Sequence, residues 1–343
     1  MNHVDYIDRC IEIAKKGEGW VNPNPMVGCV IVNNGEIISE GYHRKFGENH
    51  AERNAILPLM GDSRLKNSTL YVTLEPCSHQ GKTPPCANLI IDVGIPEVVI
   101  SMLDPNPLVA GNGIKKLEQA GVKVTVGVGE KKATLLNKFF LNFYENKKPY
   151  VTLKWAESSD HFIGKMECEA IKITDEKVQK YTHKLRKAHS AILVGVNTWI
   201  NDQPQLTDRF WGGPQPIKII LDPNLRGTYE NAAGETWVFN SKKSEVKDQL
   251  KYINLGENTS IDLNQILDYL YSEGINSVLV EGGKKTLEKF IEFGLFNEVH
   301  RFINHGVKLQ NGISAPPVEN LKLVNLESGF KEISHLYWDN YTA

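Results

Sequence analysis

The sequence predicts an α/β protein of two domains, the first built on a largely parallel sheet with helices on both faces and the second on another α/β sheet. Its length of 343 residues is enough for two domains of ordinary size. Short apolar runs typical of buried strands alternate with segments whose apolar residues recur at a helical period. The alternation stops at Lys147-Lys148-Pro149 and then begins again with a new strand, so we expect domains at 1–146 and 147–343.

The first domain is expected to begin with a helix over 6–16, followed by a hairpin. Strand-like runs at 27–32 and 37–41 flank Asn33-Asn34-Gly35, whose Asn-Gly step favours a tight turn. The remaining predicted elements are a helix over 51–60, a strand over 70–74, a helix over 86–91, a strand over 98–101, a helix over 113–120, a strand over 122–126 and a helix over 131–146.

The second domain repeats this alternation, and Thr174 stands where its first helix would need an N-terminal cap. The expected strands lie at 150–154, 191–196, 217–221, 236–239 and 278–283, and the expected helices at 175–187, 263–273 and 285–293.

Composition excludes several classes of function. The formal net charge is −2 and the charges are interspersed, which gives no electrostatic footprint for nucleic acid. No apolar run approaches the ~20 residues that span a membrane, and the N-terminus lacks the pattern of a signal peptide. Five cysteines, an odd and low number, suit a reducing compartment. We therefore expect a cytoplasmic protein that binds neither nucleic acid nor membrane.

One histidine and two cysteines stand in the order that a zinc site requires. His50 precedes the helix over 51–60, Cys77 follows the strand over 70–74, and Cys86 begins the next helix, where thiolate is favoured over thiol. An imidazole and two thiolates would bind Zn²⁺ with three protein ligands and leave the fourth position to water. Zinc lowers the pKa of such a water towards neutrality.

Glu52 supplies the acid/base group that this chemistry needs. Residues two apart on a helix point to different sides, so Glu52 would stay off the metal that His50 binds. It could take a proton from the water and deliver it to a ring nitrogen and a departing amine, as in zinc deaminases. Taken alone, the histidine could be a helix cap and the cysteines core thiols or a disulfide. Their combination in this order favours the metal site.

The cysteine spacing departs from the commonest deaminase pattern. Eight residues separate Cys77 from Cys86 in place of two, so the loop over 78–85 would lie beside the metal, held at both ends by ligands. We expect this loop to read the substrate.

With these motifs in hand, the chain resembles the bifunctional deaminase/reductase family of riboflavin biosynthesis over essentially its full length. The long cysteine spacing is that family's version of the motif. The segments that carry the resemblance lie at 22–28 (Asn-Pro-Asn-Pro-Met-Val-Gly), 50–52, 73–79, 81–86 and 104–107 (Asp-Pro-Asn-Pro).

The resemblance implies a cytidine-deaminase-like, three-layer first domain that hydrolyses the ring amine of 2,5-diamino-6-(5-phosphoribosylamino)pyrimidin-4-one. The family's substrate contacts fall on Asn24, His43, Lys82 and Thr83. An amide can read the edge of the ring, and Lys82 offers a cation to the phosphate unless it is an ordinary solvated loop lysine.

The second domain resembles the family's reductase, which has a dihydrofolate-reductase-like fold. The resemblance implies that NADPH reduces the ribosyl chain of 5-amino-6-(5-phosphoribosylamino)uracil to ribityl. Guanidinium groups match a phosphate, and a glycine pair before a helix start suits a pyrophosphate. The matching residues are Lys154, Asp202 and Glu281 for catalysis, Arg186, Leu206 and Arg209 for substrate, and Thr174, Thr198, Asp202, Gly282 and Gly283 for cofactor.

Three positions of the second domain depart from the family pattern. His161 replaces a glycine, Lys172 replaces a tryptophan and Ala170 replaces a serine. We expect an active reductase in a homo-oligomer that acts on a small-molecule substrate. The alternatives are a weakened reductase, a monofunctional deaminase of a nucleoside or tRNA base, and a metal-stabilised scaffold that binds nucleotide without catalysis.

Overall fold

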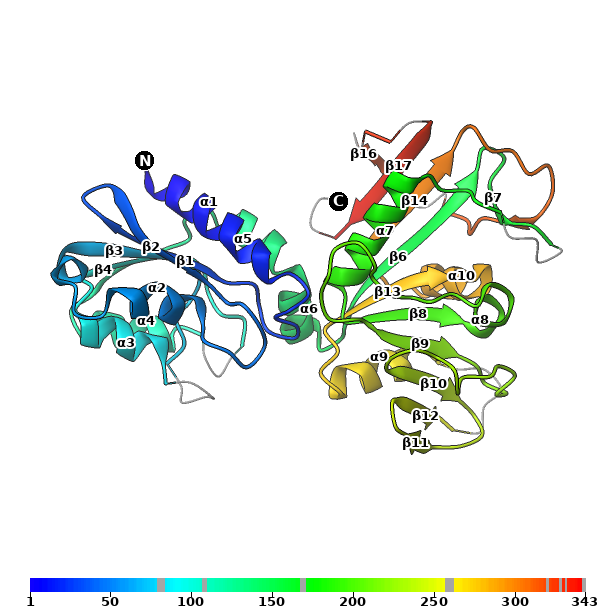
Figure 1. Cartoon of the computed structure of the whole chain (residues 1–343), viewed down its shortest axis with the longest axis horizontal. Coiled ribbons are helices and arrows are strands. Elements are labelled where there is room, and N and C mark those ends of the chain that lie inside the picture. Colours follow the sequence, from blue (N-terminus) through cyan, green and yellow to red (C-terminus); the bar gives the residue numbers. More distant parts are fainter. Residues whose placement is uncertain are drawn as a thin grey trace. The chain divides into compact units, whose positions relative to one another are not determined.

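The computed structural model describes residues 1–78, 84–106, 110–166, 171–256, 262–318, 321–326, 329–330 and 332–340. The chain divides into two compact units, Met1–Asn146 and Lys147–Ala343, and each unit has its own sheet (Figure 1). In the part of the chain that is described, we find no helix both long and apolar enough to cross a membrane.

The first unit is built on a five-stranded sheet with the order β2-β1-β3-β4-β5. The central strand β3 pairs antiparallel with β1 and parallel with β4, so the sheet is mixed. The hairpin turn forms as predicted, with positive φ angles of 50° at Asn34 and 83° at Gly35. The strands are β1 (Gly28–Asn33), β2 (Glu36–Tyr42), β3 (Ser68–Leu74), β4 (Glu97–Met102) and β5 (Lys123–Val126).

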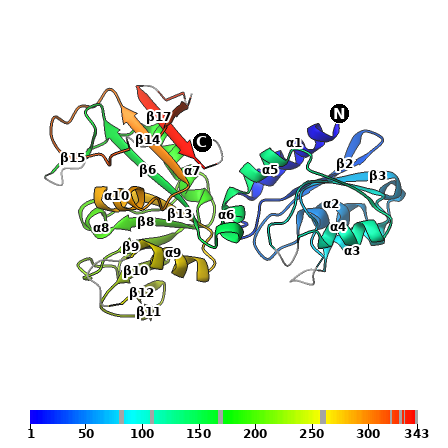
Figure 2. The same ribbon diagram turned by 180° about the vertical axis from the view of Figure 1, so that it is seen from behind.

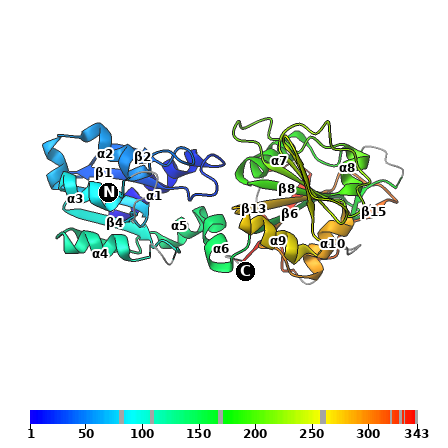
Figure 3. The same cartoon turned by 90° about the horizontal axis from the view of Figure 1, so that it is seen from below.

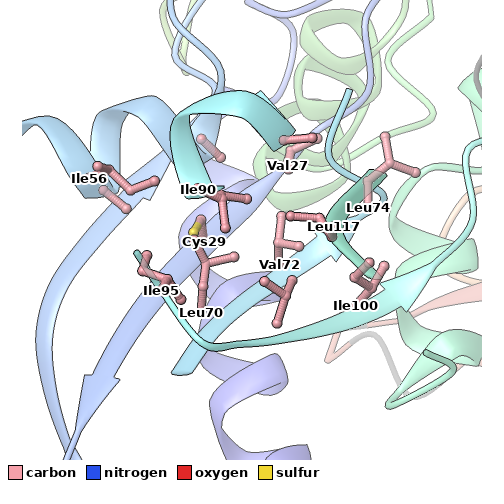
Figure 4. Packing of buried hydrophobic residues seen from close by; sticks show 14 of the residues in the cluster. Val27, Cys29, Ile56, Leu70, Val72, Leu74, Ile90, Ile95, Ile100 and Leu117 are labelled. Atoms are coloured by element: carbon pink, nitrogen blue, oxygen red, sulfur yellow. The ribbon is translucent and has the colours of Figure 1, made fainter. Parts of the chain in front are cut away.

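Helices cover both faces of this sheet, which confirms the predicted three-layer architecture (Figures 1 and 2). On one face, Ile56, Ile90 and Leu117 of three helices pack against Leu70 and Val72 of β3 (Figure 4). The helices of this face are α2 (Ala51–Ile56), α3 (Cys86–Val93) and α4 (Asn112–Gln119); those of the other face are α1 (His3–Ala14) and α5 (Glu130–Leu136). Short 3₁₀ turns lie at Lys15–Gly17, Leu57–Leu59 and Ser63–Asn67.

The predicted single helix over 131–146 is wrong, because it is broken at Asn137 into α5 and α6 (Lys138–Asn146). The side chain of Asn137 leaves the helical pattern and bonds to the backbone of Met26. Its Oδ1 accepts from the Met26 N–H at 2.8 Å, and its Nδ2 donates to the Met26 carbonyl at 3.0 Å. The buried Asn137 amide thus ties the junction of α5 and α6 to the segment that leads into β1.

The second unit is built on a ten-stranded sheet with the order β11-β12-β10-β9-β8-β13-β6-β14-β17-β16. The strands from β12 to β14 in that order run parallel, and antiparallel strands complete both edges. The strands are β6 (Tyr150–Ser158), β8 (Ala191–Gly195), β9 (Ile217–Leu221), β10 (Thr236–Asn240), β11 (Glu245–Lys247), β12 (Leu250–Asn254), β13 (Ser277–Gly282), β14 (Glu298–Asn304), β16 (Val324–Leu326) and β17 (Ile333–Asp339). A separate pair joins β7 (Phe162–Gly164) to β15 (Ile313–Ser314).

Two helix layers bury the two faces of this sheet (Figure 3). Along β13, Val278 and Val280 pack in one core cluster and Leu279 in another, which is the alternation of a strand buried on both faces. The first cluster includes residues of α9 (Leu263–Ser272) and α10 (Lys284–Glu292), and the second is packed by residues of α7 (Glu176–Ala188) and α8 (Val196–Asp202).

Several local predictions for this unit are wrong. The first strand extends to Ser158, four residues beyond the predicted end at Lys154. The cap of α7 is Asp175 in place of Thr174, since the Asp175 carboxylate accepts from the Val178 N–H at 2.8 Å. Asp202 ends the helix α8, which the sequence did not indicate.

The Asn137 amide generates a first prediction. Replacing it in Asn137→Ala leaves the part-buried N–H and carbonyl of Met26 without this partner, so the free energy of unfolding of the first unit should fall by about 1–3 kcal/mol. Denaturant unfolding measures the change. The exposed Asn146→Ala is the control, and equal stability of the two variants would contradict the bridging role.

Candidate active sites

The three metal-ligand candidates of the first unit meet at one point. His50 is the N-terminal cap residue of α2, Cys77 follows β3, and Cys86 is the first residue of α3. The His50 Nδ1 lies 3.5 Å from the Cys77 Sγ and 3.6 Å from the Cys86 Sγ. Tetrahedral Zn²⁺ at ordinary bond lengths separates a nitrogen and a sulfur ligand by about 3.5 Å. The donor set therefore fits zinc in both chemistry and spacing.

The protonation of these groups is coupled. The hydrogen bond from Cys86 lowers the pKa of Cys77 to about 4, while the same contact with Cys77 and burial raise the pKa of Cys86. The hydrogen bond with Cys77 raises the pKa of His50 to about 9. Zinc requires two thiolates and a neutral imidazole, so metal binding competes with protons at these three side chains.

Glu52 lies on α2 with only 3% of its surface exposed. It lines a cavity of ≈ 320 Å³ whose wall also includes His50 and Cys77. Burial raises the pKa of Glu52 to about 7, and a metal cation nearby would act in the opposite direction. The carboxyl group is thus placed to exchange protons inside the cavity that contains the metal ligands.

Asn24 and His43 line the same cavity and contact each other. The His43 Nδ1 lies 3.1 Å from the Asn49 carbonyl, which can only accept, so Nδ1 carries the proton. The bare Nε2 then accepts from the Asn24 Nδ2 at 3.3 Å, and burial lowers the pKa of His43, which keeps the ring neutral. The two substrate candidates are therefore held as a pair. Lys82 and Thr83 lie outside the described residues.

The sequence reasoning missed further residues of this cavity wall. They come from the segment after β4, from the loop after β3, from the loop before α2 and from α6. The Asp-Pro-Asn-Pro segment was a usable signal, because it follows a parallel strand whose carboxyl end lies beside that of β3. The missed residues are Phe46, Glu75, Asp104, Asn106, Phe140 and Tyr144.

In the second unit, a buried ion pair joins two of the predicted site residues. The Arg186 guanidinium donates through Nε and Nη2 to the two oxygens of Glu281, at 2.6 and 2.7 Å, and through Nη1 to the Thr207 carbonyl at 3.2 Å. Burial lowers the pKa of Lys154, and the nearby charge of Glu281 opposes that shift. Arg186 was predicted to bind phosphate, but its Nε and Nη2 groups donate to Glu281 instead.

The predicted cofactor glycines lie at a tight junction. Gly282 ends β13, and Gly283 caps α10 with a φ of 79°. A Cβ added at Gly282 or Gly283 would come within 3.1 or 3.0 Å of the Thr198 side chain. The structure therefore brings Thr198 to both glycines and leaves their backbone uncovered by side chains of their own, which suits a pyrophosphate at a helix start.

The other predicted reductase residues are more dispersed. Leu206 has a φ of 50° and its side chain is buried in the core, so a ligand would meet its backbone. Arg209 is exposed and donates to the Gln205 amide oxygen at 3.1 Å, and Asp202 is exposed at the end of α8. Thr174 lines an open cavity of ≈ 450 Å³ together with Lys172.

The departure at His161 has a structural explanation. His161 adopts a φ of 63°, a conformation that favours glycine. Its Nδ1 lies 2.6 Å from a carboxylate oxygen of the buried Glu157, which also pairs with Arg301 at 2.6 Å. The contact with Glu157 is one that a glycine at this position could not make. Ala170 lies outside the described residues.

A three-layer α/β unit with a His-Cys-Cys donor set beside a buried glutamate defines a zinc deaminase, here joined to a second α/β unit. The family model described as the cytidine and deoxycytidylate deaminase zinc-binding region matches residues 1–102. The model of the RibD C-terminal domain matches residues 149–305.

Relatives match both units. The riboflavin biosynthesis protein RibD of Actinobacillus pleuropneumoniae is 42% identical over 316 residues, covering 88% of this chain and 84% of that protein. RibD of Bacillus amyloliquefaciens is 40% identical over 351 residues, covering 98% and 92%. A crystal structure from Thermotoga maritima, of a diaminohydroxyphosphoribosylaminopyrimidine deaminase/5-amino-6-(5-phosphoribosylamino)uracil reductase, has a TM-score of 0.87 and 36% identity, covering 98% of this chain and 97% of that one.

The chain belongs to the RibD family of riboflavin biosynthesis proteins. It is a bifunctional enzyme with deaminase and reductase activities, and its cofactors are Zn²⁺ and NADPH. These findings confirm the family, fold class, function and cofactors that the sequence indicated. A monofunctional nucleobase deaminase and a non-catalytic scaffold are not favoured, because the relatives extend over both units.

The donor geometry predicts one zinc ion per chain. Cys86→Ala removes one of three protein ligands, so zinc content should fall well below one per chain in metal analysis of the purified protein. Cys10→Ala is the matched control, because Cys10 is a buried thiol among the α1 side chains of the other helix layer and should leave the content unchanged. Full zinc in Cys86→Ala would exclude this ligand set.

Proposed function

We propose that the two activities are divided between the units, with deamination in residues 1–146 and reduction in residues 147–343. The substrate of the first step is 2,5-diamino-6-(5-phosphoribosylamino)pyrimidin-4-one, and that of the second is 5-amino-6-(5-phosphoribosylamino)uracil. The Thermotoga relative is described as a deaminase and reductase of these two compounds, which supports this choice, as does membership of the RibD family. The observation that carries the first assignment is the pair of 3.5 and 3.6 Å distances between His50 and the two cysteines, beside a cavity that contains Glu52.

In the proposed deamination, His50, Cys77 and Cys86 would hold Zn²⁺, which would supply the Lewis acidity that makes water a nucleophile towards the ring carbon. Glu52 accepts the proton of the water, passes it to the ring nitrogen and then assists the departure of ammonia. A carboxyl group that must both accept and donate works best with a pKa near the working pH, and burial moves Glu52 in that direction.

Substrate orientation is assigned to the polar wall of the cavity. Asn24 donates to His43 through Nδ2, which leaves its carbonyl oxygen for the edge of the pyrimidine ring. The neutral ring of His43 donates through Nδ1 to the Asn49 carbonyl, so its Nε2 can only accept a hydrogen bond. We assign Lys82 and Thr83 to the phosphate.

In the proposed reduction, NADPH supplies the hydride to the ribosyl carbon, and the ring oxygen takes a proton as the chain opens. Thr174, Thr198, Gly282 and Gly283 would bind the cofactor, with Asp202 beside it. Lys154 would contact the sugar, while Asp202 and Glu281 would orient the reactants and handle protons. Leu206 and Arg209 would complete the substrate side.

The ion pair with Glu281 changes the role that we propose for Arg186. Nε and Nη2 of Arg186 both donate to Glu281 and Nη1 donates to Thr207, so we assign Arg186 to holding the Glu281 carboxylate in place and only its two remaining N–H groups to substrate. Arg209, whose guanidinium is exposed, is then the better phosphate ligand.

We also propose that the enzyme works in the cytoplasm as a homo-oligomer and does not bind nucleic acid. A net charge of −2 supports the last point, and the free thiols Cys10, Cys29, Cys77 and Cys86 among the described residues support a reducing compartment.

Glu52→Gln tests the proton transfers. The amide cannot accept the proton of water, and one positioned acid/base group contributes about 10²–10⁴-fold to a rate, so deamination should fall at least that much. Zinc content should stay at the parental level, because Glu52 does not bind the metal. Deamination within a few-fold of the parent would contradict the role, and the surface variant Glu97→Gln serves as the control.

The independence of the reductase is tested with the substrate already deaminated. Glu52→Gln protein, mixed with 5-amino-6-(5-phosphoribosylamino)uracil and NADPH, should oxidise the cofactor at the parental rate, as followed by its absorbance. Asp202→Ala should abolish this oxidation while deamination continues. An absence of oxidation by the parent protein would mean that the changes at His161, Ala170 and Lys172 have inactivated the reductase.

A further inference from the structure

Glu75 is a buried carboxylate of the first unit with no part in the chemistry assigned so far. It stands between β3 and Cys77, lines the cavity, and has 3% of its surface exposed. Its Oε2 accepts from the backbone N–H of Gly111 at 2.9 Å and of Asp104 at 3.4 Å. Its Oε1 accepts from the N–H of Gly113 at 2.9 Å and of Ile114 at 3.4 Å. Four N–H groups of one neighbouring segment therefore point at a single carboxylate.

These bonds join both ends of a loop to one side chain. Asp104 follows β4, while Gly113 and Ile114 belong to the first turn of α4, where a negative charge is favourable. Asp104 and Gly111 donate to the same oxygen, so Glu75 holds the backbone at Asp104, just after β4, and at Gly111, just before α4. The positions of these two points depend on one carboxyl side chain.

The start of α4 packs closely against the backbone that follows β3. A Cβ added at Gly113 would lie 2.0 Å from the Pro76 carbonyl oxygen, so the start of α4 packs directly on the residue between Glu75 and Cys77. The Glu75 N–H also donates to the Met102 carbonyl at 3.0 Å, which extends the pairing of β3 and β4. Glu75 is thus fixed by its own backbone as well as by its carboxylate.

Two described residues that follow β4 line the deaminase cavity. Asp104 and Asn106 line the same cavity as Glu52, and the Asn106 N–H donates to the Asp104 Oδ1 at 2.9 Å, which closes a tight turn. We propose that Glu75 is a positioning residue for the deaminase, which sets Asp104 and Asn106 against the substrate without touching it. This inference rests on the proposed function of the cavity as the deaminase site.

The test separates positioning from zinc binding and from general stability. Glu75→Gln replaces one accepting oxygen by an NH₂ group, which faces two backbone N–H groups and cannot bond to them. Steady-state deamination should then show a KM raised roughly 10- to 100-fold, as small displacements of substrate-binding groups cause. The kcat should stay within a few-fold of the parent, and zinc should stay stoichiometric. Glu97→Gln, at a surface ion pair with Lys123, is the matched control and should leave KM unchanged.

A double-variant cycle identifies the path of the effect. If Glu75 acts through the loop, Asn106→Ala should raise KM and the combination with Glu75→Gln should raise it by less than the product of the two effects. A lower melting temperature with unchanged KM would overturn the proposal, as would loss of zinc together with kcat, or fully multiplicative effects. If Glu75→Gln does not fold, Glu75→Asp, which keeps the charge and shortens the reach, is measured by the same criteria. Failure of the proposed function would be distinct, because the parent protein would then not deaminate the substrate.

Discussion

The convergence of two helix starts and one strand end organises the deaminase unit. His50 caps α2, Cys86 begins α3, and Cys77 follows β3, so the position of the metal ligands follows from how these elements pack on the sheet. The core beneath them, with Ala51, Ile56 and Ile90, is fully buried and resists displacement. The packing of these elements thus brings the three ligand atoms within 4.8 Å of one another.

The second unit relies on a different constraint, an ion pair between elements that are 95 residues apart. Glu281 near the end of β13 would be a buried charge without Arg186 of α7, and removal of one partner of such a pair is strongly destabilising. The pair therefore links the helix layer to the strand end where the glycine junction begins. The stability of the second unit and the geometry of the glycine junction therefore depend on the same ion pair.

The fold class and the metal ligands could be predicted from the sequence because their patterns are local or chemically distinctive. The alternation of apolar runs indicates the α/β class, and the order of His50, Cys77 and Cys86 indicates the metal because its ligands are few and chemically distinctive. The sequence was insufficient where distant residues decide. The break at Asn137 depends on Met26, 111 positions away. Strand β14 was missed because its polar residues hide the pattern, and only the fold shows that Glu298 and His300 bond to each other at 2.8 Å inside the sheet.

The break between α5 and α6 has a consequence for dividing the polypeptide. Phe140 and Tyr144 of α6 form part of the cavity wall, and α6 runs to Asn146, the last residue of the first unit. A gene fragment that stops near 137 would encode the whole sheet and all three metal donors but would lack one wall of the pocket. A fragment cut from this chain to carry the cavity must therefore keep α6, which ends at Asn146, the last residue of the first compact unit.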